Sequence, residues 1–175
     1  MAQNGYKYNN SKNGYFGAEL SYEIDSLKLI SGGFSVNGYN NNGSSQQASS
    51  LTNATGILQG YDIGNIYNGH GGGGDASINY QIGFKANKNR LLTFSYRYSG
   101  YASNAFSSVD LSQEVNYNIP DYQQPNNQST SEHTFQVDYT TPVGKVNVEA
   151  GAKAILRADQ SNNQYLSIDS TSRQY

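Results

Sequence analysis

The 175-residue sequence has no cysteine, which excludes disulfide bonds, zinc–thiolate sites and thiol catalysis together. Charge is also scarce, because charged residues make up 14% of the chain, against about 25% in typical soluble domains. The net charge of -2 offers nucleic acid no basic face. Apolar residues total only 35%, and no stretch approaches the roughly 18 consecutive apolar residues of a transmembrane helix.

Tyrosine and glycine are the residues that this sequence has in plenty. It contains 16 tyrosines and 19 glycines, and asparagine, glutamine and serine recur throughout. Its first residues, MAQNGYKYNN, lack the basic segment and the apolar segment of a signal peptide. Either the protein is cytoplasmic or its natural N-terminus lies upstream of Met1, and the strand pattern described below favours the second.

The stretch RLLTFSYRYSGY, residues 90–101, shows the pattern on which the interpretation depends. From Leu92 onward, apolar or aromatic residues alternate with polar ones, and a strand has a side-chain period of two. The stretch is therefore a strand whose apolar face carries Phe94 and whose polar face carries Arg97. In a soluble sheet the apolar face is the core, whereas in an outer-membrane barrel it contacts lipid.

The same alternation predicts six strands in three hairpins, and no helical period is evident. The strands cover residues 15–24, 27–39, 75–86, 91–101, 132–141 and 146–158. They are longer than the roughly 5–6 residues usual in globular proteins, and a tilted strand of about 9–11 residues crosses a bilayer.

The predicted connections alternate between short and long. Three tight turns are built from turn-forming residues, at Asp25-Ser26, Asn87–Arg90 and Pro142–Lys145. Residues 40–74 and 102–131 form two long connections rich in Asn, Gly, Ser and Gln, and the tail after Ala158 begins like a third. Outer-membrane barrels have this asymmetry, with short periplasmic turns and long extracellular loops.

Keeping apolar residues opposite one another also predicts the register of each hairpin. The expected pairs are Ala18–Phe34 and Tyr22–Ile30, Ile82–Tyr96 and Phe84–Phe94, and Phe135–Ala150 and Val137–Val148. On the polar face, this register places Gln81 opposite Arg97 and Gln136 opposite Glu149. Gly32-Gly33 is a candidate site for a β-bulge.

The strand count limits how much of a barrel this chain can form. Single-chain bacterial barrels begin at about eight strands, and an open sheet in lipid leaves the backbone groups of its two edges unpaired. We therefore expect residues 1–175 to be a single segment of a larger barrel. The predicted fold class is all-β, an antiparallel up-and-down meander that forms a partial transmembrane β-barrel.

The third hairpin, EHTFQVDYTTPVGKVNVEAGAKAILRADQSNNQY, resembles the outer-membrane β-barrel family of Bacteroidetes that is related to TonB-dependent receptors. GYFGAELSYEIDSLKLISGGFSVNGY and NRLLTFSYRYSGY fit the same family in the same order, so the resemblance covers residues 14–165. The resemblance implies the outer membrane of a Gram-negative bacterium and an N-terminal plug, often after a carboxypeptidase-like domain. Neither precedes residue 14 here, and no ligand-binding residues carry over, because the resemblance lies in scaffold strands.

Each candidate for chemistry has a simpler structural explanation. The stretch HGGGG, residues 70–74, lacks the following helix of a phosphate-binding loop, so we predict a flexible loop. His70 and His133 are the only histidines, too few for a metal cluster, and His133 is expected to cap the mouth at a strand entry. Asp62 and Asp75, with nearby asparagines, lack the spacing of an EF-hand calcium loop.

Charged and aromatic side chains complete the candidate set. The charges of the polar face are expected to line the barrel lumen: Glu19, Glu23, Arg97, Asp138, Glu149 and Lys153. Tyrosines near strand ends are expected to form interfacial girdles: Tyr15, Tyr39, Tyr98, Tyr101 and Tyr139. Tyrosines of the long connections are alternative stacking contacts for a sugar or peptide: Tyr61, Tyr67, Tyr117 and Tyr122.

The favoured hypothesis is a segment of a TonB-linked outer-membrane receptor that imports a scarce extracellular ligand. Its expected partners are outer-membrane lipid, the remainder of the barrel with its plug, the TonB complex and that ligand. Two alternatives stay open: a non-transporting pore or anchor barrel, and a secreted all-β glycan-binding or adhesin module. No nucleophile–base or metal constellation appears, so the sequence predicts no enzyme, no cofactor and no catalytic, cofactor-binding or metal-binding residues.

Overall fold

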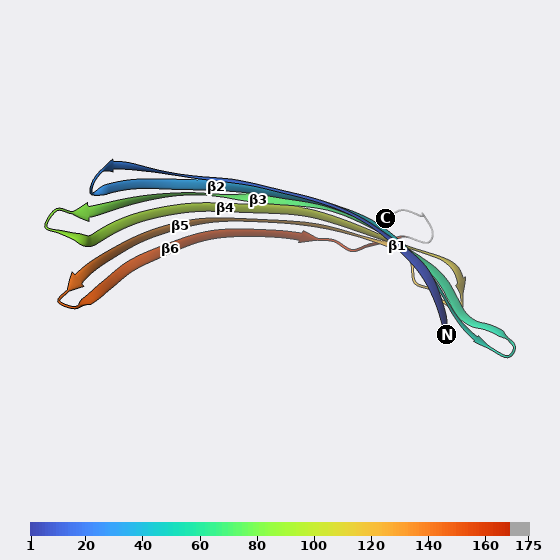
Figure 1. Ribbon diagram of the computed structural model, residues 1–175. Helices are drawn as coiled ribbons and strands as arrows, with labels where there is room; N and C mark the ends of the chain where they lie inside the picture. The colour runs from blue at the N-terminus through green and yellow to red at the C-terminus, as the bar shows by residue number, and fades with distance from the viewer. Residues whose placement is uncertain (169–175) are drawn as a thin grey trace.

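The computed structural model describes residues 1–168, which form an antiparallel all-β sheet (Figure 1). Six long strands are followed by a short seventh. Their bounds are β1 Ala2–Asp25, β2 Lys28–Asn53, β3 Gly56–Phe84, β4 Asn87–Val115, β5 Tyr122–Val143, β6 Val146–Asn163 and β7 Leu166–Ser167. Within this part of the chain, no helix is long and apolar enough to cross a membrane.

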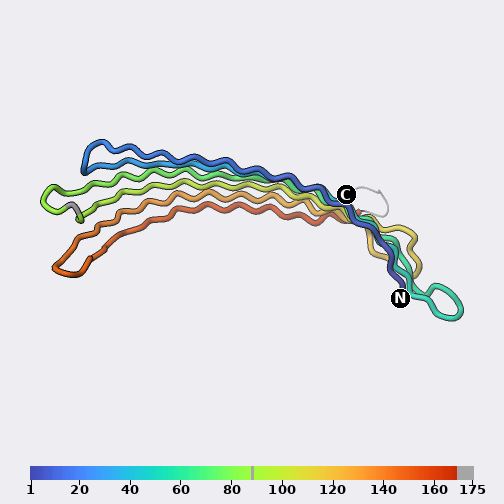
Figure 2. The backbone as a smooth tube through the Cα atoms, viewed as in Figure 1, coloured from blue at the N-terminus to red at the C-terminus, as the bar shows by residue number. Residues whose placement is uncertain are grey.

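The long strands pair in chain order, β1-β2-β3-β4-β5-β6, so β1 and β6 are the two edges of the sheet. The strands lie side by side along nearly their whole length, as the backbone traces in Figure 2 show. Beyond Asn163 the regular ladder breaks, but the Gln164 N–H donates to the Pro125 carbonyl, and Leu166 again pairs with Gln123. β7 is therefore an interrupted continuation of β6 along β5.

Four predicted strands lie inside an observed strand, whereas 27–39 and 75–86 extend past β2 and β3 into the turn residues Leu27 and Lys85-Ala86. The predicted long connections are wrong. Residues 40–53 extend β2 and residues 56–74 belong to β3, so only Ala54-Thr55 remain as the turn. Similarly, most of residues 102–131 extend β4 and β5, and the tail after Ala158 continues β6 as far as Asn163. β3 and β4 have 29 residues each, a strand length of about 95 Å at about 3.3 Å per residue.

Backbone pairing explains why these polar segments are strands. Asn, Gly, Ser and Gln have low strand propensity and give no apolar–polar alternation, so residues 40–53 carry little strand signal of their own. In the sheet, however, residues 40–50 lie between two neighbouring strands, as Asn41 lies between Ser11 and Gly69. Because the ladders on both sides satisfy the backbone N–H and C=O groups, pairing overrides propensity here.

Short polar side chains and a glycine close the turns. Asp25 Oδ1 accepts a hydrogen bond from the Leu27 N–H at 2.8 Å, and Asn53 Oδ1 accepts one from the Thr55 N–H at 2.9 Å. Gly144, in the β5–β6 turn, has a φ of 64°, a left-handed conformation that favours glycine.

The predicted register is confirmed in the first hairpin. Ala18 pairs with Phe34 and Tyr22 with Ile30. The ladder passes through Gly32-Gly33 without a shift, so the bulge expected there is wrong, and the irregularity lies between Glu23 and Asp25.

The register of the other two hairpins is wrong, because their turns lie elsewhere. The second turn is Lys85-Ala86 rather than Asn87–Arg90, and the third is Gly144-Lys145 alone. The observed pairs are Ile82–Leu92, Tyr80–Phe94, Gln81–Thr93, Phe135–Ala154, Val137–Ala152 and Gln136–Lys153. Gln81 therefore does not face Arg97, and Gln136 does not face Glu149. Each shift is by an even number of residues, so every side chain keeps its predicted face.

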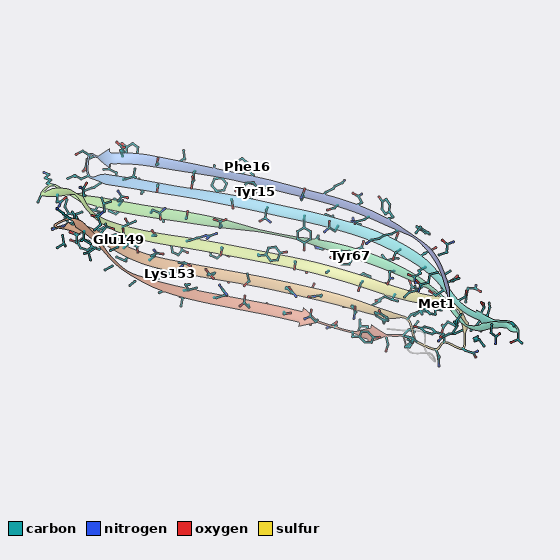
Figure 3. The ribbon with its side chains drawn as sticks, turned by 60° about the horizontal axis from the view of Figure 1, so that its bottom comes forward. Met1, Tyr15, Phe16, Tyr67, Glu149 and Lys153 are labelled. Carbon is teal, nitrogen blue, oxygen red and sulfur yellow. The ribbon has the colours of Figure 1, made fainter. Side chains whose placement is uncertain are left out.

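One row of directly paired residues divides the sheet into two halves. The row consists of Phe16, Val36, Gly74, Gly100, Ser131 and Ala158. The proximal half runs from this row to the tight turns and comprises residues 16–36, 74–100 and 131–158. The distal half comprises residues 2–15, 37–73, 101–130 and 159–168. In Figure 3, Glu149 and Lys153 mark the proximal half, and Met1 marks the opposite end of the sheet.

The sheet is a single layer, so it has no conventional core. Val109 is the buried hydrophobic residue of the described part, at 5% exposure. On the apolar face, Phe94 remains 44% exposed, Ile78 49% and Leu156 63%. The apolar side chains of the proximal half therefore need a nonaqueous environment from outside residues 1–168.

Candidate functional site

The proximal half has one apolar face to which every long strand contributes. Its central rows of paired residues are Leu20–Gly32–Ile78–Tyr96–Phe135–Ala154 and Tyr22–Ile30–Tyr80–Phe94–Val137–Ala152. Aromatic rings link neighbouring strands, with centroids 5.8 Å apart for Phe16 and Phe34 and 5.0 Å apart for Tyr96 and Phe135. The face is about 9 residues tall on each strand, the height of a tilted strand that crosses a bilayer.

The opposite face of the proximal half is polar and charged. Arg97 Nη2 lies 3.5 Å from Asp75 Oδ1, and Ser35 Oγ donates to Asp75 Oδ2 at 2.5 Å. Between paired residues of β5 and β6, Arg157 Nε donates to Glu132 Oε2 at 2.9 Å. Exposed pairs of this kind contribute little to stability, because water and salt screen their charges. Their main consequence is therefore a polar surface that water can wet.

The charges predicted to line the lumen all lie on this polar face, but they do not converge. Glu19 and Arg97 belong to one row, with β2 and β3 between them, and Glu23 and Asp138 are separated by three strands. Asp138 Oδ2 instead accepts from Gln136 Nε2 at 2.7 Å. Glu149 pairs with Thr140 and Lys153 with Gln136. This spread suits a wall that lines a channel, because general acid–base chemistry needs groups within hydrogen-bond reach.

The two histidines lie on different strands and have separate partners. His133 is in the middle of β5, not at a strand entry, and its Nδ1 lies 2.9 Å from Tyr96 Oη. Its ring also packs against Tyr98, with centroids 5.0 Å apart. His70 Nε2 lies 3.3 Å from Asn104 Nδ2. Among residues 1–168, no group of three His, Cys, Asp or Glu side chains is placed to hold a metal ion.

The other candidates for ligand binding are separated or differently folded. Asp62 and Asp75 both belong to β3, about 43 Å apart at about 3.3 Å per residue, so they cannot share a calcium ion. The stretch HGGGG is neither a flexible loop nor a phosphate cradle, because residues 70–74 lie inside β3. Gly71, for example, pairs with Tyr39 on one side and Ser103 on the other.

The girdle prediction is wrong for three of the five tyrosines. Tyr98 and Tyr139 lie on the apolar face, as an interfacial girdle requires. Tyr15, Tyr39 and Tyr101 lie on the polar face instead. They are paired there with Asn37, Asn13 and Gly73, respectively. The sequence places a tyrosine near a strand end, but only the strand register decides its face.

Of the tyrosines predicted for loops, Tyr117 alone lies in a connection of the described chain. Its ring stacks on Tyr61 of β3, with centroids 4.2 Å apart, and Tyr122 stacks on Tyr165 at 5.0 Å. Nearby, Asn116 Nδ2 donates to the Leu58 carbonyl at 2.8 Å. These contacts fasten the distal end of the sheet. Tyr67 instead projects from β3 on the same face as Tyr39 and Tyr101, a grouping that sequence reasoning missed.

A match to a protein-family model agrees with this geometry. The family model described as "Outer membrane protein beta-barrel family" matches residues 82–175, more than half of the chain. No curated protein matches the chain. The cryo-EM structure of the membrane pore complex of pneumolysin aligns over 97% of this chain and 33% of its own, with 11% sequence identity and a TM-score of 0.21. The chain thus spans about a third of the pneumolysin chain, and this weak likeness carries no argument.

The family match and the fold lead to the same conclusion. The matched residues run from the end of β3 to the C-terminus and include β4, β5 and β6. These strands have one apolar face of bilayer height and one polar face. The chain therefore belongs to the outer membrane protein β-barrel family, and its open sheet is part of a barrel wall in the outer membrane.

Proposed function

We propose that this chain forms part of the wall of a receptor barrel that takes up an extracellular ligand in a TonB-dependent manner. In this arrangement the apolar face of the proximal half contacts lipid, and the face with Arg97 and Asp75 lines the lumen. The tight turns lie in the periplasm, and the distal half rises outside the cell, as in barrels with short periplasmic turns.

The height of the distal half is the observation that carries this proposal. A bilayer requires about 9–11 residues per strand, but β3 continues over residues 56–73 and stays paired on both sides for most of that length. At about 3.3 Å per residue, this adds a strand length of about 60 Å. A passive pore gains nothing from so tall a polar wall, whereas a receptor gains an external vestibule that concentrates a dilute ligand.

The TonB dependence rests on the similarity of residues 132–165 to barrels related to TonB-dependent receptors. We propose no catalytic role, because the lumen charges are distributed along the wall. The remainder of the barrel, a plug and the TonB complex are the partners that this function requires. A secreted binding module would need the apolar face as its own core, and an outer-membrane location removes that need.

A non-transporting pore or anchor barrel has the same wall, so the test must measure transport. We would place the full-length protein in planar bilayers and compare nutrient accumulation in cells with and without its gene. A TonB-dependent receptor is closed to ions at rest, and its uptake stops when a protonophore collapses the proton-motive force. Steady ion conductance with uptake that survives the protonophore would identify a passive pore. No conductance and no uptake defect would identify an anchor.

A further inference from the structure

Four tyrosines of the distal half lie on one face of four adjacent strands. They are Tyr15 of β1, Tyr39 of β2, Tyr67 of β3 and Tyr101 of β4, and we call this group the tyrosine platform. It lies on the face that carries Arg97 and Asp75 in the proximal half. Figure 3 labels Tyr15 and Tyr67, which lie between the charged end of β6 and Met1.

Glycines of β3 allow three of these rings to lie against the backbone. A Cβ atom added to Gly71 would come within 2.9 Å of Tyr39 Cε1, and one added to Gly69 within 2.5 Å of Tyr67 Oη. A Cβ on Gly73 would lie 3.2 Å from Tyr101 Cδ2. A side chain at Gly69 would therefore displace the Tyr67 ring, and one at Gly71 would press on both the Tyr39 ring and the Ala102 carbonyl oxygen. Gly69, Gly71 and Gly73 therefore form the backbone surface against which these rings lie.

The rings of the platform are coupled to one another and remain accessible. Tyr101 Oη and Tyr39 Oη share a hydrogen bond of 3.3 Å across β3. The pKa of Tyr39 is raised above its ordinary value, first by this hydrogen bond, then by partial burial and by the nearby Tyr101 and Tyr67. Tyr67 is still 43% exposed and Tyr101 40% exposed. A ligand in the lumen would therefore meet several aromatic surfaces at once.

The rows that form the platform are polar but almost free of charge. Charges enter the same face in the flanking rows, with Asp75, Glu132 and Arg157 on the proximal side and Lys7 on the distal side. The rows that contain the four tyrosines and the row between them present amides and hydroxyls, including Asn13, Asn37, Asn41, Ser103 and Gln128. In these rows of the described chain, the one charged residue is Asp159, which accepts a hydrogen bond from Thr130 Oγ1. Asn41 Oδ1 and Asn126 Oδ1 have no hydrogen-bond partner within residues 1–168.

We propose that the tyrosine platform binds a neutral oligosaccharide, an inference that rests on the lumen assignment in the proposed function. The C–H face of a sugar ring packs on an aromatic ring, and its hydroxyls exchange hydrogen bonds with amides and tyrosine hydroxyls. An anionic ligand would instead need Lys or Arg side chains, which bind carboxylate and phosphate strongly. The platform crosses four strands spaced about 4.8 Å apart, so it suits a chain of sugars better than a single ring.

The test is calorimetric titration of the full-length protein in detergent with a panel of neutral hexasaccharides of glucose, mannose, xylose and galactose. Anionic oligogalacturonate is the charged comparison. The key variant carries Tyr39→Ala and Tyr101→Ala. A second variant carries Tyr39→Phe and Tyr101→Phe, which keeps both rings. Tyr8→Ala is the matched control, because Tyr8 is 57% exposed in the distal half but lies on the opposite face.

We expect at least one neutral hexasaccharide to bind and oligogalacturonate not to bind. The double alanine variant should weaken binding about tenfold or more, which corresponds to about 1.4 kcal/mol, because it removes two aromatic contacts to the ligand. The double phenylalanine variant keeps both rings and loses only the hydroxyls, so it should weaken binding less than the double alanine variant, whereas Tyr8→Ala should stay within about threefold of the natural protein. Gly69→Ala should also weaken binding, because it displaces the Tyr67 ring without removing it, and the three atoms nearest to the added Cβ all belong to the Tyr67 side chain. This variant keeps the test valid if the double alanine variant misfolds.

The proposal is overturned if no neutral hexasaccharide binds, as when a plug segment covers the platform, or if the alanine and glycine variants bind normally. These outcomes differ from a failure of the receptor function. Protonophore-sensitive uptake without sugar binding would support the receptor function and contradict sugar binding by the platform. Sugar binding by a barrel that conducts ions freely would support sugar binding by the platform and contradict TonB-dependent uptake.

Discussion

The proximal and distal halves of the sheet share one continuous backbone ladder but carry different side chains. In the proximal half, an apolar face around Ile78 and Phe94 lies opposite a charged face around Arg97 and Asp75. In the distal half both faces are polar, and tyrosines lie over glycines on one of them. The comparison teaches that backbone pairing with neighbouring strands determines how far a strand extends. The polarity of its side chains determines whether each face lies against lipid or water.

The halves are therefore stabilised by different forces. The apolar face of the proximal half gains free energy only when hydrocarbon replaces water around it, at roughly 25 cal/mol for each Å² of apolar area. The distal half has few apolar side chains to transfer, so it depends on the hydrogen bonds of the ladder and on contacts such as Tyr61–Tyr117. A change at equivalent places in the two halves should have unequal effects.

The largest difference is expected for a charge on the face that we assign to lipid. Ile78 and Ile66 lie on the same face of β3 and are 49% and 45% exposed, but Ile78 is proximal and Ile66 distal. Ile78→Arg should cost about 2–4 kcal/mol near the bilayer midplane, and Ile66→Arg close to zero. Urea unfolding of the full-length protein in lipid vesicles measures both. Equal costs would remove the distinction between the halves.

A smaller effect is expected from proline in the distal half. Asn68 lies in β3 between Asn42 and Phe106, so Asn68→Pro removes a ladder hydrogen bond from a central strand and should cost about 1–3 kcal/mol locally. Amide hydrogen exchange should accelerate in residues 40–50 and 60–73, whereas Asn68→Ala should leave protection nearly unchanged. If the amides of these segments are unprotected in the natural protein, the segments are long loops rather than strands.

The smallest effect is expected when low pH acts on the turn at Asp25 in the proximal half but not on the turn at Asn53 in the distal half. The pKa of Asp25 is lowered, chiefly because its carboxylate accepts a hydrogen bond from the Leu27 N–H, with a further contribution from Lys28. A carboxyl group with a lowered folded-state pKa stabilises the turn above its unfolded pKa of about 3.9 and loses this effect as pH falls through the folded value. The equivalent Asn53 of the distal turn does not titrate.

Protection factors for the Leu27 and Thr55 amides, measured by hydrogen exchange between pH 6 and pH 2.5, test this difference. We expect acid to lower protection at Leu27 and not at Thr55. Asp25→Asn should abolish the pH dependence. Parallel loss at both amides would show that acid acts on the whole sheet rather than on Asp25.

Much of the proximal half could be predicted from sequence. Alternation around Phe94 and Phe135 identified each strand and each face correctly, because one side of every strand is uniformly apolar there. Hairpin register was less predictable, since a turn shifted by a few residues changes the partners without changing the face. Val137 opposite Ala152 keeps apolar residues together as well as Val137 opposite Val148 does.

The distal half could not be predicted in the same way. Residues 40–53 have polar side chains on both faces, so no period reveals the strand, and its conformation depends on β1 and β3 beside it. The turn at Asn53–Gly56, with Leu51 and Ile57 on either side, was the one local signal for this hairpin. The tyrosine platform depends on register across four strands, which no single segment encodes.

The central claim is that hydrocarbon surrounds one face of the proximal half and that water surrounds both faces of the distal half. The chain has no native cysteine, so single cysteines along β3 can be spin-labelled without background from it. In lipid-reconstituted full-length protein, labels at Ala76, Ile78 and Tyr80 should be accessible to oxygen and shielded from a water-soluble nickel complex. Labels at Ser77, Asn79 and Ile66 should show the reverse. Equal accessibility at Ile78 and Asn79, or at Ile78 and Ile66, would contradict the account.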